Sequence, residues 1–148
     1  MVSRDVQNEA PKKSQWAWVW PAALAATIVF ASSRSHVAGP EFQDSDKVVH
    51  FFVYGLLGSL VCRLGNGWRA VGWAVLAVSI FGATDEWHQS FVPGRSCEFA
   101  DWVADTTGAA LAASIYTAWP WYRRLMEFPL GRKRRIEKPA ATATLSGP

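Results

Sequence analysis

Cysteine is scarce in this chain, and its two residues, Cys62 and Cys97, are too few to build a disulfide scaffold. No C-x-x-C pair and no Cys/His spacing typical of a zinc site is present. The sequence also lacks H-E-x-x-H, G-x-S-x-G and similar motifs that mark hydrolytic active sites. We therefore expect no cofactor, and the motifs assign no metal ligands.

Charge is sparse in the middle of the chain. Ten of the fifteen Lys and Arg residues lie within residues 1–15 and 122–148, although the net charge of the whole chain is +3. These basic residues form no recognition helix and no patch interleaved with aromatic residues, so we expect no nucleic-acid partner. Half of the residues are hydrophobic and nine are Trp. This composition favours a membrane as the partner of the basic ends.

Four apolar segments stand out, each close to the lower limit of the roughly 17 to 25 residues that span a hydrocarbon core. None shows the alternation of a barrel strand, and small residues are frequent in all of them. The pattern predicts an all-α membrane protein, a bundle of four transmembrane helices. A soluble bundle is the alternative, but it requires polar stripes that the first and third segments lack. The segments are 16–31, 48–62, 68–83 and 99–118.

The distribution of positive charge predicts the orientation of such a bundle. If the N-terminus is cytoplasmic, the outer loops hold only Arg34, Lys47 and Arg95, and the other twelve basic residues lie inside. The positive-inside rule therefore predicts a multi-pass protein with both termini in the cytoplasm. In this topology residues 1–15 form an N-terminal tail, 16–119 the transmembrane domain and 120–148 a basic C-terminal tail.

Two further consequences concern the first segment and the cysteines. Residues 16–31 follow Lys12 and Lys13 and end in small residues, so a cleaved signal peptide is an alternative to a first span. Cleavage would leave the remaining topology unchanged. The four-span topology sets Cys62 and Cys97 on opposite sides of the membrane, so no bridge between them is expected.

The unusual polar residues of the spans share one level, the extracytoplasmic face. Helical spacing predicts one shared face for Asp46, His50 and Tyr54, and another for Gly82, Glu86 and Gln89. Asp46 and Asp101 could merely cap helix starts, but ionisable groups deeper in a membrane face the bundle interior and are functional by default. We expect a polar site there, formed by Asp46, Lys47, His50, Tyr54, Glu86, Gln89, Arg95, Asp101 and Asp105. Asp85, which lies off the Glu86 face, is a weaker candidate, and His36 and His88 are expected at the surface.

The same residues carry a family resemblance. The stretches "DKVVHFFVYGLLGSL", "DEWHQSFVPGR" and "DWVADTTGAALA" resemble the three signature blocks of the VanZ-like family of bacterial membrane proteins, in order, over about residues 45–115. The blocks read D-K-x-x-H-x-x-x-Y, E-x-x-Q-x-F-x-x-x-R and D-x-x-x-[ND]-x-x-G, so this chain has the acid at Asp105. The resemblance implies a multi-helix protein of the bacterial cytoplasmic (inner) membrane. Because the family takes its name from a member linked to teicoplanin resistance, glycopeptide susceptibility is one phenotype that it suggests.

Two functions compete on these residues. In the first, Lys47 and Arg95 bind the anionic headgroup of a phospholipid or a lipid-linked envelope precursor, because Arg suits bidentate phosphate contacts and Lys a point charge. In the second, His50, Glu86 and Asp105 serve an enzyme as an acid/base set or as metal ligands, with a lipid phosphate as substrate. The sequence favours the first without excluding the second, and it sets no oligomeric state.

Overall fold

The computed structural model describes residues 16–35 and 45–127, and within them the chain forms five α-helices and no strand. The prediction of an all-α fold is therefore confirmed, and the first four helices coincide with the four apolar segments. The third helix continues to Gln89, beyond its apolar segment, so the acidic stripe that ends this segment is helical. The helices are α1 (Val19–Ser32), α2 (Ser45–Cys62), α3 (Gly67–Gln89), α4 (Phe99–Ala118) and α5 (Pro120–Met126).

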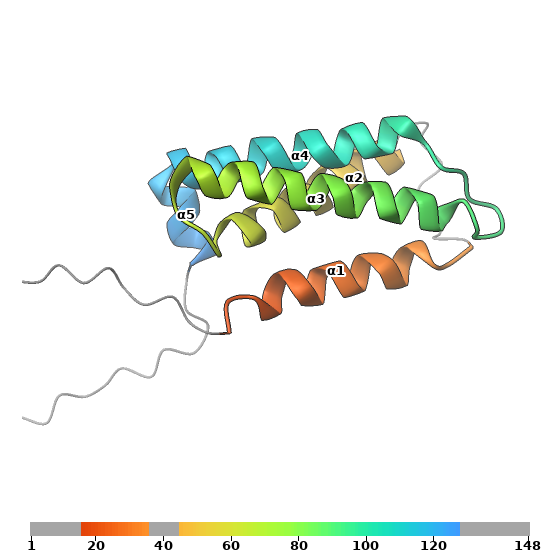
Figure 1. Ribbon diagram of the computed structural model, residues 1–148, viewed down its shortest axis with the longest axis horizontal. Helices are drawn as coiled ribbons and strands as arrows, with labels where there is room; N and C mark the ends of the chain where they lie inside the picture. Colours follow the sequence, from red (N-terminus) through yellow and green to blue (C-terminus); the bar gives the residue numbers. More distant parts are fainter. Residues whose placement is uncertain (1–15, 36–44, 128–148) are drawn as a thin grey trace, which may run out of the picture.

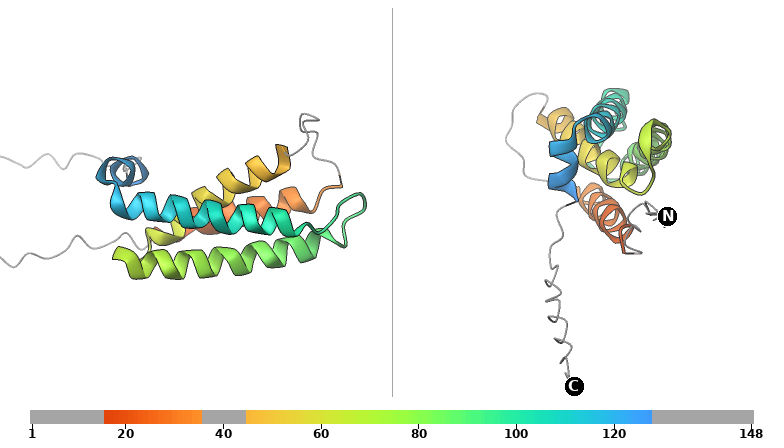
Figure 2. Two further views of the ribbon diagram at one scale, coloured as in Figure 1. Left: turned by 90° about the horizontal axis from the view of Figure 1, so that it is seen from above. Right: turned by 90° about the vertical axis from the view of Figure 1, so that its left-hand side faces the viewer.

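The first four helices run in alternating directions (Figure 1). The C-terminal ends of α1 and α3 therefore meet the N-terminal ends of α2 and α4 at one end of the bundle, as Figure 2 also shows. We call this the polar end and define it by residues 32–33, 46–54, 85–95 and 98–105. The opposite end, where α2 finishes and α3 begins, we call the apolar end, and we define it by Cys62, Ala70, Val71, Ala74, Ala113 and Tyr116.

The closest helix pair is α2 with α4, and small residues make this approach possible. A Cβ atom at Gly58 would lie 2.8 Å from the Ala109 Cα. At Gly108 it would overlap the backbone of Phe51. The glycines thus bring α2 and α4 into backbone contact, and this contact sets the depth at which the polar residues of the two helices face each other.

The core lies between α2, α3 and α4 and consists of two adjoining clusters. The apolar end forms the first cluster. The second lies midway along the bundle and includes Tyr54 and Val78, with Ile28 contributed by α1. Because α1 makes fewer contacts than the other long helices, it is the outermost member of the bundle (Figure 1).

Large apolar side chains also cover the outside of the bundle. Phe52 on α2 is 68% exposed, and Trp73 and Ile80 on α3 are 71% and 58% exposed. Among the described helices, α3 is the one that is both long and apolar enough to cross a membrane, whereas the apolar α1 has 14 residues. At about 1.5 Å per residue, α1 measures roughly 21 Å, less than a hydrocarbon core of about 30 Å.

A short helix, α5, occupies the start of the segment that the sequence predicts as a C-terminal tail. Pro120 begins it, as is common in a first helical turn. The Arg63 guanidinium donates to the Met126 carbonyl over 2.8 Å, and the Tyr116 hydroxyl donates to Glu127 over 2.6 Å. The tail is therefore tied to the apolar end through residue 127, and the rest of it, like residues 1–15, lies outside the described residues.

Candidate functional site

The last two turns of α3 carry buried polar side chains. Asp85, Glu86 and Gln89 are only 3% to 4% exposed, and Gly82 lies one turn before them on the same side. The predicted shared face of Gly82, Glu86 and Gln89 is thus confirmed. A helix end that buries three polar groups needs partners for each, because an unpaired buried polar group costs about 1 to 3 kcal/mol.

Asp85 is the most fully hydrogen-bonded of these groups. Its Oδ1 accepts from the Ser32 hydroxyl at 2.6 Å, and its Oδ2 accepts from the Tyr54 hydroxyl at 2.9 Å and from the Gln89 amide at 3.0 Å. The carboxylate therefore joins α1, α2 and α3. The sequence sets Asp85 off the face of Glu86, but in the structure Asp85 is also buried and points into the bundle toward α1 and Tyr54.

His50 and Asp105 form a pair across the α2–α4 contact. The His50 Nδ1 lies 2.9 Å from the Asp105 Oδ1, where a ring N–H donates to the carboxylate. Asp105 is wholly buried, and the His50 ring stacks on Tyr54 with centroids 5.7 Å apart. The backbone approach at Gly108, one turn from Asp105, places the two side chains in reach of each other.

The second oxygen of Asp105 and one oxygen of Glu86 are buried and have no hydrogen-bond partner in the part of the chain that the structure describes. Asp105 Oδ2 lies against Gly82, where a Cβ atom would approach it to 2.8 Å. The other oxygen of Glu86, Oε2, accepts from the Glu98 backbone N–H at 2.8 Å. Each carboxylate is thus held by one oxygen while the other remains open to a further contact.

His50, Glu86 and Asp105, the three catalytic candidates of the sequence, come together. Each offers one ligand atom, and these atoms all lie within 4.8 Å of one another. The three residues come from α2, α3 and α4, so no local sequence motif could have specified their proximity. The arrangement is chemically able to share a proton or to coordinate a cation.

Lys47 lies at the rim of the polar end. Its ammonium is 3.4 Å from the Glu98 carboxylate and 3.9 Å from Asp101. Asp101 is buried and its Oδ1 has no hydrogen-bond partner. The sequence predicts that Asp46, His50 and Tyr54 share one face of the helix. Tyr54 is buried and His50 is partly buried, but Asp46 is exposed, so only part of this face points into the bundle.

A tight turn between α3 and α4 positions Arg95. The Arg95 backbone N–H donates to the Val92 carbonyl at 3.1 Å. Gly94 has φ of +80° and follows Pro93, which fits a type II turn. The Arg95 Nε is buried without a hydrogen-bond partner. Among the described residues, no carboxylate forms an ion pair with the Arg95 guanidinium.

The charges of the polar end are unbalanced toward the negative. Four of its carboxylates are 6% exposed or less, and the cations beside them are Lys47 and, when protonated, His50. A buried charge is costly unless it is paired. The interior of the site therefore favours a cation or a proton, and an anion is favoured only at the rim. The four carboxylates are Asp85, Glu86, Asp101 and Asp105.

Several contacts at the polar end were not predicted. Ser32 bonds Asp85, and the Ser33 hydroxyl lies 3.1 Å from the ring of His88, which is exposed as expected. Glu98 contacts both Glu86 and Lys47. The predicted topology already places the end of the first span at the outer level, so its serines could have been inferred. His36 lies outside the described residues.

A sequence model of the VanZ/LLP1 family matches residues 4–120. The chain belongs to the VanZ/LLP1 family. The resemblance of the three signature blocks is thereby confirmed, and the matched span includes every residue of the polar end. Comparisons with curated proteins and with solved structures give no match.

Proposed function

We propose that this VanZ/LLP1 protein crosses the bacterial cytoplasmic membrane four times, with both termini inside and the polar end facing out. Exposed apolar side chains such as Phe52, Trp73 and Ile80 support the proposal, because in lipid they remain solvated by hydrocarbon. The bias of Lys and Arg toward the other end of the helices supports the orientation. Helix α1 would span with its flanking residues, including the aromatic residues from Trp16.

The native cysteines provide a test of orientation. Cys97 is exposed at the polar end and Cys62 is buried at the other. A membrane-impermeant maleimide added to intact spheroplasts should label the protein, and Cys97→Ser should abolish the labelling. Labelling that appears only after the cells are lysed would show the opposite orientation.

At this end the protein is proposed to bind the anionic headgroup of a phospholipid or lipid-linked envelope precursor. The observation that carries the proposal is Arg95, a rim cation whose buried Nε has no hydrogen-bond partner within residues 16–35 and 45–127. A guanidinium in this position is suited to bidentate contact with a phosphate. Lys47 adds a second positive charge at the rim, although Glu98 already offsets part of it. Through such binding the protein would influence access of glycopeptides to envelope precursors.

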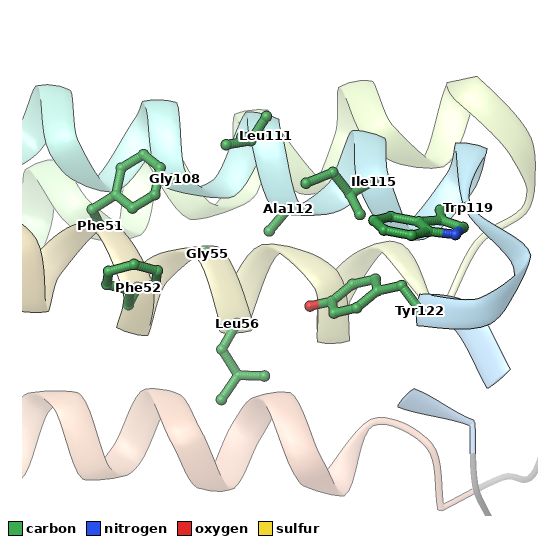
Figure 3. Close-up of a pocket in the computed structure, with 10 residues that line it drawn as sticks. All are labelled: Phe51, Phe52, Gly55, Leu56, Gly108, Leu111, Ala112, Ile115, Trp119 and Tyr122. Atoms are coloured by element: carbon green, nitrogen blue, oxygen red, sulfur yellow. The ribbon is translucent and has the colours of Figure 1, made fainter. Parts of the chain in front are cut away.

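An apolar groove on the surface of the bundle, lined mainly by α2 and α4, is suited to the acyl chain of the lipid. Small residues such as Gly55 and Ala112 form its floor, and aromatic side chains close its two ends (Figure 3). The groove measures about 380 Å³, and a second hollow of about 440 Å³ shares Phe51 and Phe52 with it and reaches Lys47. A chain lying in both would bring its headgroup to the rim of the polar end.

Lipid retention tests this function. Arg95→Ala should lower the amount of anionic lipid that co-purifies with the protein in mild detergent, measured by native mass spectrometry, and Lys47→Ala should lower it less. Arg69→Ala is the matched control, because Arg69 is exposed at the opposite end of α3. Unchanged lipid in both rim variants would refute headgroup binding.

A second candidate function is that of a membrane-embedded enzyme acting on a lipid phosphate. The observation that favours it is the 2.9 Å pair of His50 and Asp105, because a carboxylate that orients a His is a common acid/base arrangement. Release of inorganic phosphate from a lipid phosphate, abolished in His50→Ala, would support it. An absence of turnover together with lipid retention would favour binding alone.

A further inference from the structure

The cluster of His50, Glu86 and Asp105 has unused binding capacity. Glu86 is 3% exposed and Asp105 is fully buried, yet among the described residues Glu86 Oε1 and Asp105 Oδ2 have no hydrogen-bond partner. Native proteins rarely leave such atoms unpaired, because a buried unpaired acceptor loses the contacts that water would give it. Two open carboxylate oxygens beside one imidazole point to a missing positive partner.

We propose that His50, Glu86 and Asp105 bind one divalent transition-metal cation, of the Zn²⁺ or Mn²⁺ class. The donor set of one imidazole and two carboxylates contains no thiolate, which disfavours soft metals. The imidazole favours zinc or another first-row metal over Ca²⁺ and Mg²⁺, which prefer sites made only of oxygen. The three ligands come from three helices, so no single continuous motif contains the whole site.

The ligand atoms are near enough for such an ion if the side chains move closer together as it binds. Zinc–ligand bonds of about 2.0 to 2.2 Å in a tetrahedral site place two ligand atoms roughly 3.3 to 3.6 Å apart. The three candidate atoms already lie within 4.8 Å of one another. In the metal-free state His50 Nδ1 and Asp105 Oδ1 share a proton, whereas Asp105 Oδ2 is open; a cation held by Nδ1 would displace that proton as it binds.

The surroundings hold all three ligands in place. The Glu98 backbone N–H fixes one oxygen of Glu86, and the stacked ring of Tyr54 restrains His50. The absence of a side chain at Gly82 leaves room for the Asp105 carboxylate. Such outer contacts orient metal ligands and contribute to affinity.

The electrostatics of the polar end favour the same ion. Asp85 and Asp101 add two buried carboxylates to those of the cluster, and Lys47 at the rim offsets only part of this charge. A divalent cation would neutralise the excess where it is greatest. Three protein ligands would also leave coordination positions open, as in zinc sites that bind water or a substrate oxygen. This inference does not depend on lipid binding at Arg95.

Cobalt binding provides the test. The full-length protein, purified in detergent and treated with chelator, is titrated with Co²⁺ while its visible absorption is recorded. We expect one Co²⁺ per chain, displaced by Zn²⁺. Because loss of an outer-shell contact alone costs about 10 to 100-fold in metal affinity, Glu86→Gln and Asp105→Ala should each weaken binding by roughly 100-fold or more.

Glu127→Gln is the matched control, because it removes an exposed acid at the opposite, apolar end of the bundle. It should bind Co²⁺ as the native chain does. A native chain that gives no Co²⁺ spectrum, or variants that bind as tightly as the native chain, would overturn the proposal. Gel filtration verifies that each variant is folded, and Glu86→Gln, which preserves shape, replaces Asp105→Ala if the latter aggregates.

The same samples separate this inference from the proposed function. Arg95→Ala should lose anionic lipid and keep Co²⁺, whereas Glu86→Gln should lose Co²⁺ and keep the lipid. If Arg95→Ala retains its lipid while cobalt binding is intact, headgroup binding fails and the cation site stands. If the lipid is lost in Arg95→Ala but no variant affects cobalt, the cation site fails alone.

Discussion

Helices α2, α3 and α4 contribute to both ends of the bundle, yet the two ends are held together differently. At the apolar end, alanines and Val71 pack with Cys62 and Tyr116 in a cluster with few polar atoms. At the polar end, the corresponding positions hold carboxylates whose hydrogen bonds connect four helices. Apolar packing is tolerant of the exact partner, whereas each hydrogen bond needs its own donor and acceptor.

The two ends of the bundle have different roles. The apolar end and the midway α2–α4 contact at Gly58 fix the arrangement of the helices without using charge. The polar end accepts unpaired carboxylate oxygens that a purely structural core would avoid. Unpaired buried polar groups are typical of sites that bind a ligand or carry out a reaction. We infer that the apolar end stabilises the bundle and that the polar end is specialised for binding.

The largest effect is expected where α2 and α4 touch. Gly58→Val would drive side-chain atoms into the Ala109 backbone, which already lies 2.8 Å from a Cβ at Gly58. Because backbone cannot move aside as a flexible side chain can, we expect a loss of about 3 kcal/mol or more in the free energy of unfolding. Thermal unfolding in detergent, followed by circular dichroism, measures it.

Gly72→Val is the matched control, since a Cβ atom at Gly72 meets nothing within 4 Å. Its stability should be equal to that of the native chain or slightly higher, because Gly is a poor helix former. Equal destabilisation by both substitutions would mean that helix propensity, and not the α2–α4 contact, determines the effect.

The next effect concerns Asp85. Asp85→Ala leaves the donors of Ser32, Tyr54 and Gln89 without their acceptor, and we expect a cost of about 2 to 4 kcal/mol from one or more buried unpaired groups. Tyr54→Phe removes a single bond to the same carboxylate and should cost about 1 kcal/mol. The ratio of the two losses in the free energy of unfolding, measured by chemical denaturation, tests whether Asp85 connects the helices. Equal costs would contradict this role.

Much of this fold could be predicted from the sequence, because its signals are local. The four helices follow from runs of apolar residues, and the gathering of His50, Glu86 and Asp105 follows from their common level in an alternating bundle. The buried face of α3 follows from helical spacing, as the burial of Gly82, Glu86 and Gln89 shows.

What the sequence could not supply depends on how helices are rotated and packed. The inward direction of Asp85 requires α1 to lie beside it with Ser32, and no periodicity specifies that neighbour. The contact of the Glu98 N–H with Glu86 depends on the path of the turn. The helix α5 is short and basic, so its sequence resembles an ordinary tail.

The substitution Gly82→Ala is expected to have a small effect on stability and a larger effect on Co²⁺ binding. In Gly82→Ala the new methyl group meets the Asp105 carboxylate, a side chain that can shift, so the stability cost should be only about 1 kcal/mol. The shift would displace a proposed metal ligand, and Co²⁺ affinity should fall by about 10-fold, as for loss of an outer contact. Calorimetric titration and thermal unfolding of the same sample separate the two effects.

The smallest effect is expected at the rim, where Glu98→Gln removes the 3.4 Å ion pair with Lys47. Both side chains are partly exposed, so the pair should contribute about 0 to 1 kcal/mol, and less at high salt. The backbone N–H of Glu98 still supports Glu86 in this variant. Removing the acid also removes one of the negative charges that face Lys47, so retention of anionic lipid should rise modestly in native mass spectra. A fall in lipid retention would mean that Glu98 orients Lys47 toward the headgroup and does not compete for it.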